Sequence, residues 1–328
     1  MSGGDGSLWG DALNGETFDL DADVRTRAAW LYYMEGMTQD AVAQSLGMTR
    51  ARVLRMLASC REDGTVQITV TSPLTRCVTL GRQIEKRHGV ERAIVIPRPN
   101  DPADTADLIG AATGTYLATV LADGMTIGLG WGRTLSASLP ALPQRQFGKL
   151  TVVSLLGGLT RATAFNPSEF AWRFADRLGA ECFMMAAPVF APNADVRDAL
   201  MHHTGMEDVF THAGRLDVAL VSVGELSPNS TLARYNLLGK EEVASLVRAG
   251  AVGDLLCRFI DAEGRLLDHP LNDRVISADP TLLRRSRRVV LSSGGWDKAT
   301  VVLAAVRLLK PEVLITDEVV AERLAETD

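Results

Sequence analysis

The stretch TQDAVAQSLGMTRARVLRML, from Thr38 to Leu57, has the spacing of two short helices joined by a tight turn. Thr38 and Thr49 stand where helix N-caps are expected, because their hydroxyl groups can accept hydrogen bonds from free backbone N–H groups. Gly47 stands between them, where such a turn favours positive φ. The sequence therefore predicts a helix-turn-helix whose second helix buries an apolar stripe, namely Val53, Leu54 and Leu57.

The charged side chains of this segment indicate its chemistry. Six arginines lie between Val24 and Arg61, against the acidic residues Glu35 and Asp40, although the whole chain has a net charge of −6. Basic and hydroxyl groups at the start of a recognition helix suit the major groove and its phosphates. The alternative is a helical hairpin for packing or dimerisation with solvated arginines. The predicted DNA contacts are Thr38, Gln39, Thr49, Arg50, Arg52 and Arg55.

Length and composition limit the other possibilities. A chain of 328 residues predicts two domains, and an acidic whole chain can still contain a small basic domain. The four cysteines lack CxxC spacing, which argues against a zinc site or a disulfide framework and favours a reducing cytoplasm. Neither a signal peptide nor an apolar run long enough for a membrane is present in the sequence.

The predicted organisation has four parts. We expect a flexible leader over residues 1–22, a helix-turn-helix domain over residues 23–72, a linker helix over residues 73–88 and an effector-binding domain over residues 89–328. The helix-turn-helix domain is expected to pack Trp30, Tyr32 and Tyr33 in its core and to end in a short strand at TVQITV.

The larger domain shows short apolar runs alternating with helical stretches, a pattern typical of a doubly wound, largely parallel α/β sheet. The predicted strands are Ala93–Ile96, Met125–Gly128, Leu150–Leu155, Cys182–Ala187, Val218–Val223, Leu255–Ile260, Val289–Leu291 and Val313–Ile315. The predicted helices are Thr105–Ala122, Pro167–Leu178, Val196–His202, Lys240–Val247, Lys298–Leu309 and Glu318–Leu324.

Polar residues at predicted strand ends are candidate ligand contacts, each with a structural alternative. GLGWGRTLSASL places Arg133 and Thr134 at a helix start, as in an anion cradle or a simple strand–helix turn. Asn166 can contact ligand hydroxyls, although its local sequence favours an N-cap. Asp254 can accept bonds from paired hydroxyls or hold a turn. Lys298 in a first helical turn suggests a bound anion or a solvated lysine.

Together these segments resemble the SorC/DeoR-type family of sugar-responsive bacterial regulators. The resemblance runs from about Val24 to the C-terminus through the helix-turn-helix, GWGRTL, LLGGL, LDVALVSVG, GAVGDLLCRFIDAEG, SGGWDK and VLITDE. It implies an effector domain similar to the glucosamine-phosphate isomerase, ribose-phosphate isomerase and CoA-transferase fold. It also implies phosphorylated-sugar ligands and a homo-oligomer, either a tetramer or a dimer of dimers.

The resemblance implies a role for each matching motif. Gly132, Arg133 and Thr134 would hold the effector's phosphate or polar end, and Lys298 would help there. Asn166 and Asp254 would contact its hydroxyls. Leu156 replaces a basic residue of bisphosphate-binding members, so a monophosphate sugar or an unphosphorylated polyol fits better. RAAWLYYMEGMTQ is similar to polyol regulators, including erythritol-operon repressors. The predicted effector contacts are Gly130, Trp131, Gly132, Arg133, Thr134, Asn166, Asp254 and Lys298.

The predicted function is transcriptional control of a carbohydrate or polyol operon, as a repressor, with operator DNA and a small effector as partners. No enzymatic activity, cofactor, metal or membrane partner is expected. The alternative is a sugar-phosphate isomerase with an added helical domain, for which Asp254 and Glu169 are the acid–base candidates. A third possibility is an oligomeric scaffold with a vestigial pocket.

Overall fold

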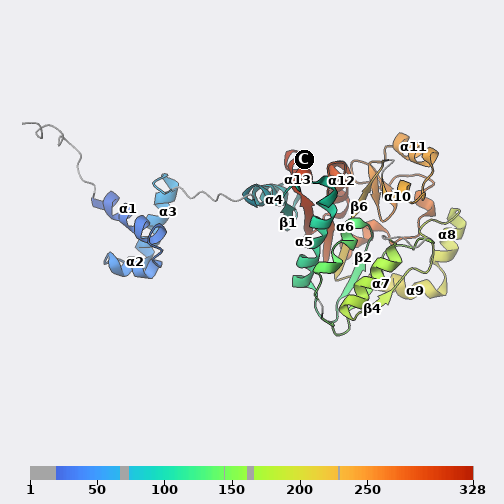
Figure 1. The fold of residues 1–328 in the computed structure, drawn as a ribbon, viewed down its shortest axis with the longest axis horizontal. Coiled ribbons are helices and arrows are strands. Elements are labelled where there is room, and N and C mark those ends of the chain that lie inside the picture. The colour runs from blue at the N-terminus through green and yellow to red at the C-terminus, as the bar shows by residue number, and fades with distance from the viewer. Residues whose placement is uncertain (1–19, 67–73, 144, 161–165, 228–229, 328) are drawn as a thin grey trace, which may run out of the picture. The chain divides into compact units, whose positions relative to one another are not determined.

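The computed structural model describes residues 20–66, 74–143, 145–160, 166–227 and 230–327, and the chain divides into two compact units, residues 1–71 and 72–328 (Figure 1). Most of the predicted leader lies outside the described residues, but its last part, residues 20–22, belongs to the first helix. Most of the predicted strand TVQITV, residues 67–70, also lies outside them.

Three helices form the described part of the first unit: α1 (Leu20–Tyr33), α2 (Gln39–Ser45) and α3 (Arg50–Glu62). The Thr38 and Thr49 hydroxyls accept bonds from the backbone N–H groups of Ala41 and Arg52, at 3.2 and 3.3 Å. Gly47 has a φ of +64° in the connecting turn. The small core contains Ala28, Ala29, Val42, Ala43, Val53, Leu57 and Cys60.

Two sequence-based assignments to this core are wrong. Leu54 is 52% exposed, because Val53 and Leu57 are four residues apart on one helical face and Leu54 lies a further 100° around it. Trp30 is 58% exposed, because α1 turns the small residues Ala28 and Ala29 toward the core instead. Tyr32 and Tyr33 are partly buried against the core, as expected.

The second unit is built on a seven-stranded parallel sheet, which confirms the predicted α/β class with a largely parallel sheet (Figure 1). The strand order is β1-β10-β9-β5-β2-β3-β4. In chain order these strands are β1 (Arg92–Ile96), β2 (Thr126–Leu129), β3 (Thr151–Ser154), β4 (Glu181–Phe183), β5 (Val218–Val221), β9 (Arg288–Ser292) and β10 (Val313–Asp317).

Side-chain alternation along the strands creates two cores, one on each face of the sheet. Leu220 and Val290 belong to one core with α5 (Thr105–Val120) and α7 (Pro167–Leu178). Their neighbours Val221 and Leu291 belong to the other, with the helices α4 (Leu74–His88), α9 (Glu207–Ala213), α12 (Ala299–Leu309) and α13 (Glu318–Glu326). The predicted linker helix α4 is therefore part of the second unit, packed on β1 and α13.

The predicted strand Leu255–Ile260 is wrong as a single element. It forms an antiparallel hairpin of β7 (Gly253–Leu255) and β8 (Arg258–Ile260), and β6 (Val223–Glu225) completes a second, three-stranded sheet. Leu256 and Cys257 make the two-residue turn with φ values of +53° and +62°. Such turns usually carry Asn or Gly, so this sequence gave no signal for a hairpin.

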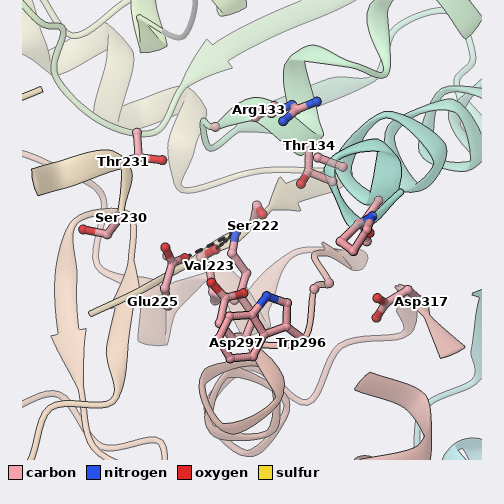
Figure 2. Close-up of a pocket in the computed structure, with 18 of the residues that line it drawn as sticks. Arg133, Thr134, Ser222, Val223, Glu225, Ser230, Thr231, Trp296, Asp297 and Asp317 are labelled. Carbon is pink, nitrogen blue, oxygen red and sulfur yellow. Dashed lines mark hydrogen bonds and ion pairs between the residues drawn. The ribbon is translucent and has the colours of Figure 1, made fainter. Parts of the chain in front are cut away.

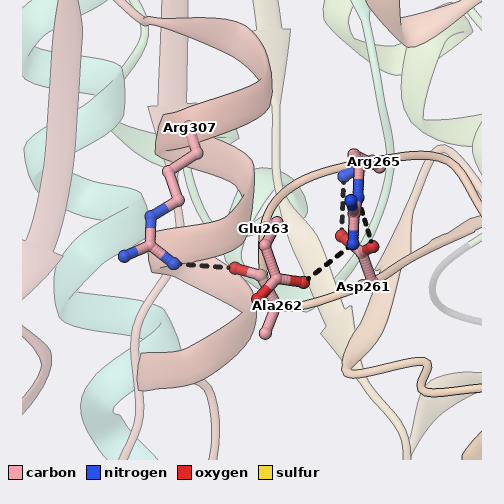
Figure 3. Close-up of polar contacts among 5 residues, drawn as sticks. All are labelled: Asp261, Ala262, Glu263, Arg265 and Arg307. Carbon is pink, nitrogen blue, oxygen red and sulfur yellow. Dashed lines mark hydrogen bonds and ion pairs between the residues drawn. The ribbon is translucent and has the colours of Figure 1, made fainter.

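The turn that follows β8 joins the small sheet to α12. Arg265 pairs with Asp261 at 2.8 Å and with Glu263 at 3.3 Å, and Arg307 of α12 donates to the Ala262 carbonyl at 2.9 Å (Figure 3). A side chain at Gly264 would overlap the backbone of α12 at Ala304. These contacts hold α12 against the small sheet.

The remaining helices are short and lie between strands. They are α6 (Arg133–Ser136), α8 (Ala194–Met201), α10 (Thr231–Arg234) and α11 (Lys240–Arg248). Single 3₁₀ segments are found at Pro102–Asp104, Leu139–Ala141, Thr204–Met206, Asn272–Arg274 and Pro280–Arg285. Among the described residues, no helix combines the length and apolar character needed to cross a bilayer.

Two aromatic residues on α7 test which face of this helix is buried. Phe174 is fully buried and Trp172 is 55% exposed. We expect Phe174→Ala to lower the free energy of unfolding by about 3–5 kcal/mol, since it leaves a cavity in the core, and Trp172→Ala by less than about 1 kcal/mol. Urea titrations of the full chain measure both, and similar losses for the two variants would contradict this orientation of α7.

Candidate functional site

A cavity of about 530 Å³ lies in the second unit, where the carboxyl ends of the parallel strands meet. Its walls come from the segments after β1, β2, β5 and β9, from the end of β10 with the start of α13, and from β6, β7 and α10. The charged residues among its lining are the bases Arg98, Arg133, Arg234 and Lys298 and the acids Glu225, Asp254, Asp297 and Asp317.

The topology explains why the cavity lies there. β2 and β5 are neighbours in the sheet, but the chain continues from β2 toward β3 on one side and from β5 toward β9 on the other. Loops that leave adjacent strands in opposite directions open a crevice at the carboxyl edge, the usual ligand position in open α/β sheets. Trp131 and Ser222, which follow β2 and β5, both line this crevice.

The turn after β2 carries five of the predicted effector contacts, and four of them line the cavity: Trp131, Gly132, Arg133 and Thr134. Gly132 has a φ of +119° as it enters α6, a conformation that favours glycine. The Arg133 guanidinium donates to the Asp107 carboxylate and to the Ala103 carbonyl, both at 2.9 Å. Gly130 packs close to Leu256 instead and is not among the lining residues.

Lys298 lines the cavity from the N-cap position of α12. Its ammonium group donates to the Val223 carbonyl at 3.3 Å and lies 3.7 Å from the Glu225 carboxylate (Figure 2). Both charged side chains are largely buried. Glu225 thus offsets a positive charge that a helix N-terminus disfavours. Sequence reasoning missed Glu225, because only the pairing of β6 with β7 brings it to this place.

Asp254 lies on β7 with 5% of its surface exposed. Its carboxylate accepts a bond from the Cys257 backbone N–H at 2.9 Å, so it holds the strained hairpin turn as well as lining the cavity. Burial raises the pKa of Asp254 to about 7, with a further upward contribution from Glu225, while the Cys257 N–H and Lys298 act in the opposite direction. Gly224 lies opposite Asp254 on the neighbouring strand β6 and leaves space for its carboxylate, because a side chain at position 224 would overlap it.

Asn166 does not reach the cavity in the structure. Its carboxamide caps α7 by accepting from Ser168 N–H at 3.1 Å, and it donates to the Leu159 carbonyl at 2.8 Å. The local capping role therefore occupies this side chain. Glu169, the second acid–base candidate, pairs with Arg173 at 3.6 Å and is also not among the cavity's lining residues. Asp254 thus has no acid–base partner from α7 there.

The predicted DNA contacts lie on the first unit at the starts of α2 and α3. The side chains of Thr38, Thr49, Arg50, Arg52 and Arg55 are exposed and Gln39 is partly exposed. Arg50 is 3.7 Å from Asp40 and donates to Gln39 at 3.4 Å, contacts weakened by solvent. The start of α3 therefore presents positive charge to solvent within this unit.

Residues 72–326 match the sugar-binding domain family. The chain belongs to this family of SorC/DeoR-type regulators.

Similar proteins cover nearly all of the chain. The erythritol catabolism regulatory protein EryD of Brucella abortus (strain 2308) is 32% identical over 93% of this chain and 97% of its own length. The deoxyribonucleoside regulator of Bacillus subtilis (strain 168) is 30% identical over 90% and 95%. The crystal structure of the full-length sorbitol operon regulator SorC from Klebsiella pneumoniae has a TM-score of 0.71 at 27% identity, over 93% of this chain and 99% of that one.

These relatives are named as regulators of erythritol catabolism, of deoxyribonucleosides and of the sorbitol operon. Their names, together with the separation of Asp254 from Glu169, do not favour the isomerase alternative. The resemblance stated from the sequence motifs is confirmed by the family match.

The buried carboxyl of Asp254 predicts a pH effect on stability. Because its pKa is raised from 3.8 to about 7, the folded chain retains a proton that the unfolded chain loses between these values. This contribution to stability is therefore present at low pH and is lost as the pH rises to about 7. Asp254→Asn cannot ionise and keeps an acceptor for Cys257. We expect the stability of the wild type relative to Asp254→Asn to fall between pH 4 and 7 in urea titrations, whereas a constant difference would contradict the raised pKa.

Proposed function

We propose that the chain is a DNA-binding transcriptional regulator, a repressor, of a sugar or polyol operon. The observation that carries this proposal is the similarity to named regulators over more than nine tenths of the chain, which includes both units. In this proposal residues 23–72 form a helix-turn-helix domain with α3 as the recognition helix, and the second unit has the isomerase-like effector fold. The protein acts in the cytoplasm as a homo-oligomer and has no enzymatic activity.

The first unit supports the DNA-binding role by its shape and charge. α2 and α3 pack through Val42, Ala43, Val53 and Leu57, while Arg52 and Arg55 project to solvent from the start of α3. A recognition helix needs an apolar face and a polar face, because the buried apolar face holds it against the domain and the exposed polar face contacts bases and phosphates. The Thr49 cap places the first backbone N–H groups of α3 beside these arginines.

The cavity of the second unit supports the effector role. Arg133 is paired with Asp107, and Lys298 with Glu225, so neither basic group is an uncompensated charge. The cavity also has equal numbers of acidic and basic lining residues. A neutral sugar or polyol can use these groups as hydrogen-bond donors and acceptors, whereas a phosphate at Arg133 or Lys298 would compete with the carboxylate that already pairs with it. The effector shifts the population of the oligomer that is competent for DNA.

The DNA-binding proposal predicts that Arg52→Ala/Arg55→Ala loses most of its affinity for a duplex selected by the wild type from a random pool. Each lost phosphate contact lowers the slope of log K against log salt by about 1. Arg248→Ala, which removes an exposed arginine of α11, is the matched control and should bind normally. Unchanged affinity and salt slope in the double variant would exclude α3 as the DNA-contacting element.

The effector proposal is tested at Lys298. A thermal-shift screen of sugars, polyols and their phosphates first identifies the compound that stabilises the wild type most. Lys298→Ala should lower the affinity for this compound about tenfold or more, because the loss leaves Glu225 without its partner, and should still bind DNA. Lys240→Ala, at the exposed start of α11, serves as control. The cavity is not the effector site if Lys298→Ala responds normally or if no compound in the screen binds.

A further inference from the structure

Trp296 has 75% of its surface exposed, the largest exposed fraction among the exposed large hydrophobic side chains of the described residues. Exposed apolar side chains are common on proteins, so exposure by itself has no functional meaning. Trp296 differs from Trp172 on α7 because it lines the cavity of the second unit. Its indole is a large flat apolar surface beside a cluster of buried charged groups.

The backbone around Trp296 is held in place on both sides. Gly294 has no space for a side chain, since a Cβ there would lie 2.5 Å from Ile109 and 3.0 Å from the Asp317 carboxylate, and Gly295 has a φ of +114°. Two residues after Trp296, Lys298 is anchored to the Val223 carbonyl and to Glu225. Trp296 therefore follows a constrained glycine turn and precedes an anchored lysine in the cavity wall (Figure 2).

The groups beside the indole suit the hydroxyls of a ligand. Asp254 and Glu225 provide carboxyl oxygens and Lys298 provides N–H donors within the same cavity. Ligand sites in proteins combine an apolar or aromatic wall with a few convergent polar groups. A carbohydrate has this same division, because its hydroxyls project from its edge while its C–H groups form an apolar face. Trp296 and the charged cluster thus match the two kinds of carbohydrate surface.

We propose that Trp296 is a specificity-determining residue of the effector site, where its ring packs on the C–H face of a sugar or polyol whose hydroxyls bind Asp254, Glu225 and Lys298. This inference rests on the proposed effector site. It requires a ligand with adjacent C–H and hydroxyl surfaces, which both cyclic sugars and open-chain polyols provide. Compounds that contain only charged groups, such as inorganic phosphate, offer no surface to the indole.

Calorimetry with ribose, glucose, erythritol, sorbitol and inorganic phosphate tests this proposal on the full chain. For the sugar or polyol that the wild type binds, Trp296→Ala should raise Kd about tenfold, because aromatic contact and apolar burial are lost. Trp296→Phe keeps a flat ring and should stay within about threefold of the wild type. Trp172→Ala removes an exposed indole outside this cavity and should bind with unchanged Kd. Comparison of the wild-type Kd values for the cyclic sugars and the open-chain polyols shows which of the two classes provides the C–H face.

Acrylamide quenching gives a second measurement. The emission that is lost in Trp296→Phe belongs to Trp296, and bound ligand should protect this component from the quencher. The inference is overturned if Trp296→Ala binds the wild-type ligand with unchanged Kd, a result that leaves the effector site itself intact. It is also overturned if no sugar or polyol binds the wild type. A third contradicting result is a change of the oligomer mass in Trp296→Ala, measured by light scattering, because the indole would then face a second copy of the chain.

Discussion

The parallel pairing of β2 with β5 determines where this protein can hold a small ligand. Connections from these two strands run in opposite directions along the sheet, so the helices that follow cover opposite faces and the loops diverge at the carboxyl edge. Apolar residues alternate to fill a core on each face, which leaves the polar loop residues at the edge as the cavity wall. The position of the cavity therefore follows from the order of the strands before any polar contact is considered.

Charge within the cavity is controlled by a second, smaller sheet. The pairing of β6 with β7 places Glu225 and Asp254 on neighbouring strands, and α12 directs Lys298 toward Glu225. The Lys298 ammonium lies 3.7 Å from the Glu225 carboxylate, whereas burial raises the pKa of Asp254 to about 7. The result is a set of donors and acceptors with little net charge, a composition suited to hydroxyl groups. The same strands place the strained turn at Leu256 and Cys257 next to Gly130, so the small sheet and the β2 loop are in contact.

Much of the fold was predictable because local signals agreed with tertiary packing. The predicted helix Pro167–Leu178 has the bounds of α7, since Asn166 caps it, Pro167 begins it and Gly179 ends it in the left-handed conformation. The hairpin at Leu256 and Cys257 was not predictable, because its positive φ values are imposed by burial and by the Asp254 contact rather than by Gly or Asn. Glu225 was missed for a similar reason, and Asn166 was expected in the site although its capping contacts hold it elsewhere.

The central claim is that a sugar or polyol binds between the β2 loop and the start of α12. A crystal structure of the full chain grown with the compound that most raises its melting temperature tests this claim most directly. We predict ligand density bordered by Trp131, Gly132, Glu225 and Lys298, with hydroxyl groups within hydrogen-bond distance of the charged side chains. Density for the same compound at another surface, with this cavity containing only water, would contradict the account.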